Sequence, residues 1–264
     1  MLNHIHFVFA KIVSILLTGW LSLNLLPSSA QTTYAVIAGV SDYLNAGPTN
    51  GDLQYADDDA LLFAQLLQTP AGGNVPAQNI VLLTNHQATR DNIRRAMTLF
   101  RRAAPNDRII FFFSGHGDQG VLLPYDVGPG VVLLHNDVKQ AFRQSAARTK
   151  LLLADACKSG SMRRRTTQLQ APAPSSSTLN KNVIVMMSSR SNQFSQELRQ
   201  LQHGAFTYFL VRGVQGEADI DRNRVITMQE LYAYMRTKIG RLTAGKQIPV
   251  VFGRFPASMP FAYL

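Results

Sequence analysis

The sequence predicts an α/β fold with a central, mainly parallel β-sheet of about six strands. Short apolar runs rich in β-branched and aromatic residues alternate along the chain with segments of helical periodicity. Two of these runs are apolar on both faces, which is typical of strands in the middle of a parallel sheet. Hydrophobic residues make up 46% of the chain and charged residues 16%, and this balance excludes a disordered chain.

The first half of the chain supplies three of the strands and two helices. Each strand is a short apolar run bounded by turn-forming residues, and each helix has a broad apolar face. Asp57, Asp58 and Asp59 lie near the start of the first helix, where the helix dipole favours acids, and Thr89 can cap the second. The expected strands are residues 33–40, 80–84 and 108–114, and the expected helices are residues 53–67 and 91–102.

The second half continues the alternation after one interruption. Residues 161–181 hold three consecutive arginines followed by Gln, Ala, Pro, Ser and Thr, a composition that indicates a flexible linker. The expected strands are residues 150–154 and 183–188, the expected helices are residues 136–147, 204–214 and 227–239, and a last apolar piece covers residues 248–252.

The first thirty residues have the layout of a secretory signal peptide. An apolar run at residues 12–21 is followed by the small-residue exit Pro27–Ala30. We therefore expect export, to the periplasm or the medium, and a mature chain of residues 31–264 that forms one domain. An uncleaved membrane anchor is the alternative, although the apolar run is short for a membrane span.

The net charge of the chain bears on its partners, and its cysteine content bears on its chemistry. The formal net charge is +10, which suits nucleic acid or an anionic surface, but the sequence contains no nucleic-acid-binding module. We expect no nucleic-acid partner, and no membrane partner once the signal peptide is removed.

Cys157 is the single cysteine, so an internal disulfide is excluded. Its thiol is inert and buried, forms an intermolecular link, or is a reactive nucleophile.

Two strand ends carry the residues that decide between these roles. His116 and Cys157 follow the third and fourth predicted strands directly, and glycines flank both motifs. The carboxyl ends of parallel strands meet at one edge of a sheet, so the imidazole can act as the base that activates the thiol. The amide groups of Gly117 and Cys157 can stabilise an oxyanion. A buried cysteine and histidine that merely end strands are the alternative; a metal is not expected, because no second ligand sits at metal spacing.

At these residues the sequence resembles the caspase-like superfamily, and within it the metacaspases and their bacterial relatives, the orthocaspases. The matching motifs are Ser114-Gly115-His116-Gly117 and Asp155-Ala156-Cys157-Lys158-Ser159-Gly160, with weaker matches at residues 53–60, 123–126, 188–189, 195–197 and 203–207. The resemblance implies a three-layer α/β/α sandwich and a cysteine endopeptidase. It divides the domain into a large-subunit-like part at residues 31–165, a linker at residues 166–181 and a small-subunit-like part at residues 182–264.

The resemblance also implies a substrate preference. Asp59 and Asp155 match the acids that line the primary specificity pocket of metacaspases, and two carboxylates would select Arg or Lys before the scissile bond. For Asp59, a charge shared with its neighbours at the helix terminus is the alternative. An enzyme of this preference could cut its own chain at Arg163, Arg164 or Arg165; a solvated basic loop is the alternative there.

No cofactor is expected. Many metacaspases need calcium, but the positions after the cysteine motif that carry acids in that family hold Arg163–Arg165 in this chain. Residues 219–230 have the ligand spacing of an EF-hand loop, yet Arg224 stands where that loop needs Gly. A turn capped by Asp and Asn is the favoured interpretation of this stretch.

Two other classes of function remain open from the sequence. One is a non-catalytic caspase-like scaffold, although such proteins usually lack the His or the Cys that this chain has. The other is a cysteine hydrolase on a flavodoxin-like fold that acts on a small amide or ester. Our main expectation is a monomeric peptidase whose partners are proteins or peptides with basic residues.

Overall fold

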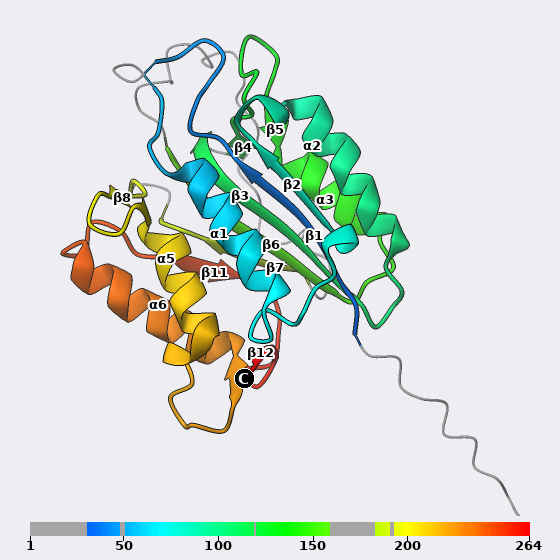
Figure 1. Ribbon diagram of the computed structural model, residues 1–264, viewed down its shortest axis with the longest axis vertical. Helices are drawn as coiled ribbons and strands as arrows, with labels where there is room; N and C mark the ends of the chain where they lie inside the picture. The colour runs from blue at the N-terminus through cyan, green and yellow to red at the C-terminus, as the bar shows by residue number, and fades with distance from the viewer. Residues whose placement is uncertain (1–30, 48–50, 119, 159–182, 191–192) are drawn as a thin grey trace, which may run out of the picture. The chain divides into compact units, whose positions relative to one another are not determined.

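The centre of the fold is a mixed, mostly parallel sheet with strand order β11-β7-β6-β3-β1-β2 (Figure 1). The computed structural model describes residues 31–47, 51–118, 120–158, 183–190 and 193–264. β11 alone in this order runs antiparallel to its neighbour, so the predicted parallel character is confirmed. The six strands are β1 (Thr33–Gly39), β2 (Ile80–Thr84), β3 (Arg108–Asp118), β6 (Thr149–Lys158), β7 (Val183–Met187) and β11 (Val250–Phe252).

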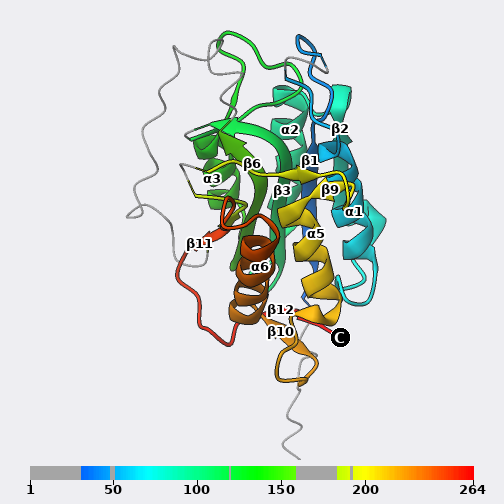
Figure 2. The same cartoon turned by 90° about the vertical axis from the view of Figure 1, so that its left-hand side faces the viewer.

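Helices cover both faces of the sheet, as Figures 1 and 2 show, and the predicted three-layer α/β/α sandwich is confirmed. One face packs against α1, α5 and α6, and the other against α2, α3 and a 3₁₀ segment. The bounds are α1 (Ala56–Gln68), α2 (Arg90–Ala96), α3 (His135–Arg143), α5 (Ala205–Arg212), α6 (Met228–Leu242) and the 3₁₀ segment η3 (Met97–Arg102). Among the described residues, no helix has both the length and the apolar character needed to cross a membrane.

The side chains of β3 alternate between the two cores, as the period of a strand requires. Phe112 joins the core beneath α1, where its ring stacks on Phe63 with centroids 4.6 Å apart. Phe111 and Phe113 join the core on the other face. All three β3 phenylalanines are fully buried, which explains why this run reads as apolar on both faces.

Two short sheets and one hairpin-like extension lie outside the sequence prediction. β4 and β5 extend the main sheet from the end of β3, β8 pairs with β9, and β10 pairs with β12. Strands this short carry too little periodicity to be found from sequence. Their bounds are β4 (Val121–Leu122), β5 (Leu133–Leu134), β8 (Glu197–Leu198), β9 (His203–Gly204), β10 (Val225–Thr227) and β12 (Pro260–Tyr263).

The first helix begins at Ala56, three residues later than the periodicity predicts. The amides of Gln54 and Tyr55 donate to the carboxylate of Glu197, at 2.8 to 3.1 Å, instead of joining the helix. A distant acid therefore satisfies amides that precede the first turn, and the pattern of α1 alone cannot reveal this. The third helix also ends early, at Arg143, since the ammonium of Lys150 takes up the carbonyls of Phe142 and Ser145.

The strands that carry the histidine and cysteine motifs are longer than predicted. β3 runs to Asp118 and β6 to Lys158, so His116 and Cys157 lie within the last residues of their strands and not after them. The predicted signal peptide, the linker at residues 166–181 and Arg163–Arg165 lie outside the described residues. The division into a large and a small part at residues 165 and 182 stays a prediction.

We predict that Phe112→Ala destabilises the domain by about 3–5 kcal/mol, because it removes a fully buried ring from the core beneath α1. Phe194→Ala is the matched control: its ring is 59% exposed, and we expect a change within about 0.5 kcal/mol. Urea unfolding of both variants measures the difference. Equal effects of the two substitutions would contradict the assignment of Phe112 to the core.

Candidate active site

The central pair of strands places the two expected catalytic residues side by side. β3 and β6 are parallel neighbours, and in their register His116 lies directly opposite Cys157. Gly117 lies opposite Lys158, so the two amides expected to bind an oxyanion belong to adjacent positions on neighbouring strands. The structure therefore brings together the backbone positions that the sequence predicts.

The ring of His116 is fixed by a carbonyl. Its Nε2 lies 2.6 Å from the carbonyl oxygen of Gly51. A carbonyl can only accept a hydrogen bond, so Nε2 carries the proton of the neutral imidazole and Nδ1 is the basic nitrogen. Burial lowers the pKa of His116, so the ring is neutral at pH 7 and can act as a base.

Tyr43 supports His116 from the loop after β1. Its ring stacks on the imidazole with centroids 5.1 Å apart, and its hydroxyl accepts the amide proton of His116 at 2.7 Å. Gly115 has φ of +153°, and a Cβ there would lie 2.9 Å from the Tyr43 hydroxyl. Glycine at this position is thus required both by the backbone and by the close approach of Tyr43.

Asp59 and Asp155 come together from different parts of the chain. Asp59 belongs to α1 and is 1% exposed, and Asp155 belongs to β6 and is 4% exposed. Gly204 lies against both: a Cβ on it would stand 2.3 Å from an oxygen of Asp155 and 2.8 Å from one of Asp59. The glycine leaves room for the two carboxylates to meet, so the pairing expected from the sequence is present in the structure.

Each carboxylate accepts several hydrogen bonds from the protein. Asp59 accepts from the hydroxyl of Ser114 at 2.9 Å, from the amide of Gly204 at 3.1 Å and from Nδ1 of His203 at 3.0 Å. The helix-terminus interpretation of Asp59 does not describe this buried position. Asp57, in contrast, bonds to Ser41 near the start of α1.

Asp155 is held by donors that follow it in the chain by 40 residues or more. It accepts from the hydroxyl of Ser195 at 2.6 Å and from the hydroxyl and amide of Thr207 at 2.8 and 3.1 Å. Thr207 lies in the first turn of α5, where amide groups have no partner within the helix. These donors stabilise the ionised form of a carboxylate that is otherwise almost wholly removed from water.

Burial works against the negative charge on both acids. It raises the pKa of Asp155, and it raises the pKa of Asp59 to about 7, with the neighbouring Asp155 adding to the effect. The carboxylate of Asp59 in turn raises the pKa of His203. The protonation of each of these three residues therefore depends on the charge of its neighbours.

Several residues of the site lie beyond what the sequence identified. His203 lacks the strand-end Gly-His-Gly setting of His116, so the sequence predicts no more for it than a surface or capping role; this prediction is wrong, since His203 bonds to the buried Asp59. Gly51 and Tyr43 lie in a loop without helical or strand periodicity. Ser195 belongs to a motif noted for its resemblance, which was the one available signal for a role at the site.

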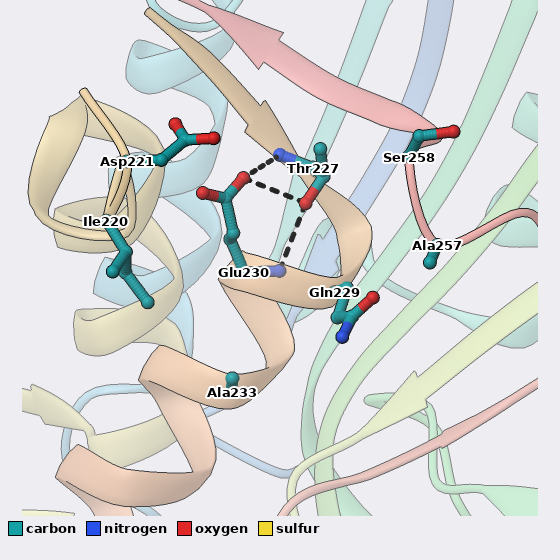
Figure 3. Close-up of a pocket in the computed structure, with 8 residues that line it drawn as sticks. All are labelled: Ile220, Asp221, Thr227, Gln229, Glu230, Ala233, Ala257 and Ser258. Atoms are coloured by element: carbon teal, nitrogen blue, oxygen red, sulfur yellow. Dashed lines mark hydrogen bonds between the residues drawn. The ribbon is translucent and has the colours of Figure 1, made fainter. Parts of the chain in front are cut away.

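The acidic stretch at residues 219–230 forms a separate cluster. Carboxylate oxygens of Asp219, Asp221 and Glu230 lie within 4.8 Å of one another. Figure 3 shows that Glu230 points to Thr227, whose amide and hydroxyl donate to it at 3.0 and 2.8 Å. Asp219 accepts the amide of Arg224, which has φ of +67°. The hydrogen bonds of a capped turn account for the arrangement of these acids.

Comparison with protein families agrees with this geometry. Residues 32–257 match the model of the caspase domain, the peptidase C14 family. The chain belongs to the caspase domain family. The recognition of a caspase-like fold from the two catalytic motifs is therefore confirmed.

Relatives of this family are distant in sequence. A curated protein, described as a probable protease of a Desulfuromonadales bacterium, is 23% identical over 246 residues, and the match covers 79% of this chain but 30% of that protein. Among solved structures, a Geobacter sulfurreducens protein matches with a TM-score of 0.62 at 17% identity, covering 88% of this chain and 99% of that one. Caspase-1 of Spodoptera frugiperda matches with 0.61 at 11% identity, covering 88% and 90%. These likenesses support the fold.

We predict that the acid pair makes the stability of the protein fall as pH rises. A carboxyl whose folded pKa is raised from 3.8 to about 7 favours folding at low pH, and that contribution is lost between these values. His203, with its raised pKa, acts in the same direction. Asp59→Asn should reduce this fall by more than about 1 kcal/mol, measured by urea unfolding between pH 4 and about 8.

The matched control for this prediction is Asp91→Asn, an exposed acid of α2 on the other face of the sheet. It should keep the pH profile of the wild-type protein. A profile for Asp59→Asn that coincides with the wild-type profile would show that Asp59 is not titrating in the folded protein over this range.

Proposed function

We propose that this protein is a cysteine endopeptidase that cleaves peptide bonds after Arg or Lys. The observation that carries the proposal is the buried pair Asp59 and Asp155, because Asp155 stands two residues before Cys157 on the same strand. A carboxylate pair at this distance from the nucleophile suits a cationic side chain next to the scissile bond. Membership of a peptidase family supports the reaction class.

The proposed reaction begins with the thiol of Cys157. Nδ1 of His116 takes the thiol proton, and the thiolate attacks the carbonyl carbon of the substrate. The negative charge moves to the carbonyl oxygen, where the amides of Gly117 and Cys157 stabilise it; an oxyanion donor typically contributes about 3 kcal/mol. The carbonyl re-forms as the C–N bond breaks, and the imidazolium gives its proton to the leaving amine.

The second half of the reaction releases the acyl group. His116 accepts a proton from water as the water oxygen attacks the thioester carbon. The attack forms a second tetrahedral intermediate. Its collapse breaks the C–S bond, and the departing sulfur of Cys157 takes a proton from the imidazolium. The Gly51 carbonyl supports both halves of the reaction because its hydrogen bond keeps the proton on Nε2. Nδ1 then stays free to accept and return the proton in each step.

We further propose that residues 1–30 direct export and that the mature enzyme acts as a monomer in the periplasm or the medium. The apolar run and small-residue exit of this segment support the proposal. Its partners would be proteins or peptides with basic residues, which fits the acid pair of the pocket.

Fluorogenic peptides that end in Arg, Lys or Asp test the specificity. We expect turnover of the Arg and Lys peptides and at least about a 1,000-fold loss in Cys157→Ala and His116→Ala. Turnover of the Asp peptide alone would refute the pocket assignment. No turnover of any peptide would favour the non-catalytic scaffold or the hydrolase of small amides and esters.

Self-processing at Arg163, Arg164 or Arg165 is tested by intact mass. We expect purified wild-type protein to contain fragments that end at one of these residues, because an enzyme of this specificity carries its own preferred sequence near the nucleophile. Cys157→Ala should remain whole, and so should a variant with all three arginines changed to Gln. An identical intact mass for the wild-type protein and Cys157→Ala would contradict self-processing.

A further inference from the structure

The carboxylates of Asp59 and Asp155 already accept several hydrogen bonds from the protein itself. Asp59 accepts from Ser114, Gly204 and His203, and Asp155 accepts from Ser195 and Thr207. A carboxylate has about four lone-pair positions, so an arriving guanidinium or ammonium finds few of them open. One of the donors must give way before a cationic side chain can bind Asp59.

His203 is the donor best placed to do so. Among the five donors named, its side chain alone can carry a positive charge. It is 21% exposed, whereas the Asp59 side chain behind it is 1% exposed. The imidazole is therefore the partly exposed neighbour of a buried carboxylate, so we infer that its outward movement would open Asp59 to a ligand.

The charges around the imidazole also favour a cation at this position. Asp59 and Asp58 face it from α1, Asp155 lies beyond Gly204 on β6, and Glu197 pairs with Gly204 across β8 and β9. Two buried carboxylates cannot both stay ionised in a site of low polarity unless a positive charge compensates them. An imidazolium supplies that charge when no substrate is present.

We propose that His203 is the internal counter-cation of the Asp59–Asp155 pair in the free enzyme and that the basic side chain before the scissile bond takes its place in the complex. The inference rests on the proposed function, since it assumes that this pair binds the substrate cation. The exchange keeps the net charge of the site unchanged. As the guanidinium or ammonium of the substrate binds, the imidazolium of His203 releases its extra proton to solvent. A neutral side chain of the same shape cannot compensate the acids and leaves His203 protonated.

Nuclear magnetic resonance of the ¹⁵N-labelled histidine rings observes this exchange directly. The His203 signal is assigned by its absence from His203→Gln, and spectra are recorded at about the pKa of Asp59, near 7. The probes are two peptidyl fluoromethyl ketones that form a thioether with Cys157, one ending in Arg and one in citrulline, the neutral counterpart of Arg. Mass spectrometry confirms that each adduct has formed.

We expect the Arg adduct to move the His203 ring from the imidazolium to the neutral form and the citrulline adduct to leave it charged. An Arg adduct with an unchanged His203 ring overturns the inference and leaves the proposed function standing. An equal change with both probes also overturns it, because the cation is then not the cause. Failure of the Arg probe to modify Cys157 overturns the proposed function, and the inference with it.

A kinetic measurement with His203→Gln supplies a second readout. The ratio of kcat/KM for Arg peptides to kcat/KM for citrulline peptides should rise with pH in the wild-type enzyme, because Asp59 and Asp155 become negatively charged as pH rises. Gln keeps a neutral donor but removes the imidazole that lowers the pKa of Asp59, so the rise should move to higher pH by about one unit or more. His86→Gln, at an exposed position, should keep the wild-type profile. A profile that does not move in His203→Gln would contradict a counter-cation role.

Discussion

The parallel pairing of β3 with β6 is the constraint on which the rest of this structure depends. One register places His116 opposite Cys157 and, two residues earlier, Ser114 opposite Asp155. Ser114 donates to Asp59, so the same two strands fix both the proposed catalytic pair and the acid pair. A slip of one residue would send each of these side chains to the opposite face of the sheet. The fully buried phenylalanines of β3 make such a slip costly.

The acid pair also joins the two halves of the chain. Asp59 comes from α1 and Asp155 from β6, yet most of their donors come from residues 195–207, near and within the start of α5. Gly204 permits this meeting because it brings no Cβ into the space that the two carboxylates occupy. The residues that we propose for substrate selection therefore also hold distant parts of the chain together. The proposed compensation of their charge by His203 rests on this burial and on the contact of His203 with Asp59.

Much of this arrangement could be predicted from the sequence. The apolar runs and helical periodicities locate the main strands and helices to within a few residues, because burial of whole faces sets those patterns. The positions of His116 and Cys157 at one edge follow from the rule for parallel strands. The start of α1 could not be found this way, since a carboxylate from residue 197 takes the amides before its first turn. The roles of His203 and Tyr43 could not be predicted for a similar reason: each acts through a contact with a residue far away in the chain.

We propose that one strand register places a binding site for a cationic side chain beside the thiol of Cys157. A crystal structure of the enzyme with an Arg-ended peptidyl ketone bound to Cys157 tests it most directly. The account predicts a thioether to Cys157, with the guanidinium within hydrogen-bonding distance of both Asp59 and Asp155 and the imidazole of His203 displaced from Asp59. A guanidinium that lies elsewhere, with the two carboxylates still closed by their own donors, would contradict it.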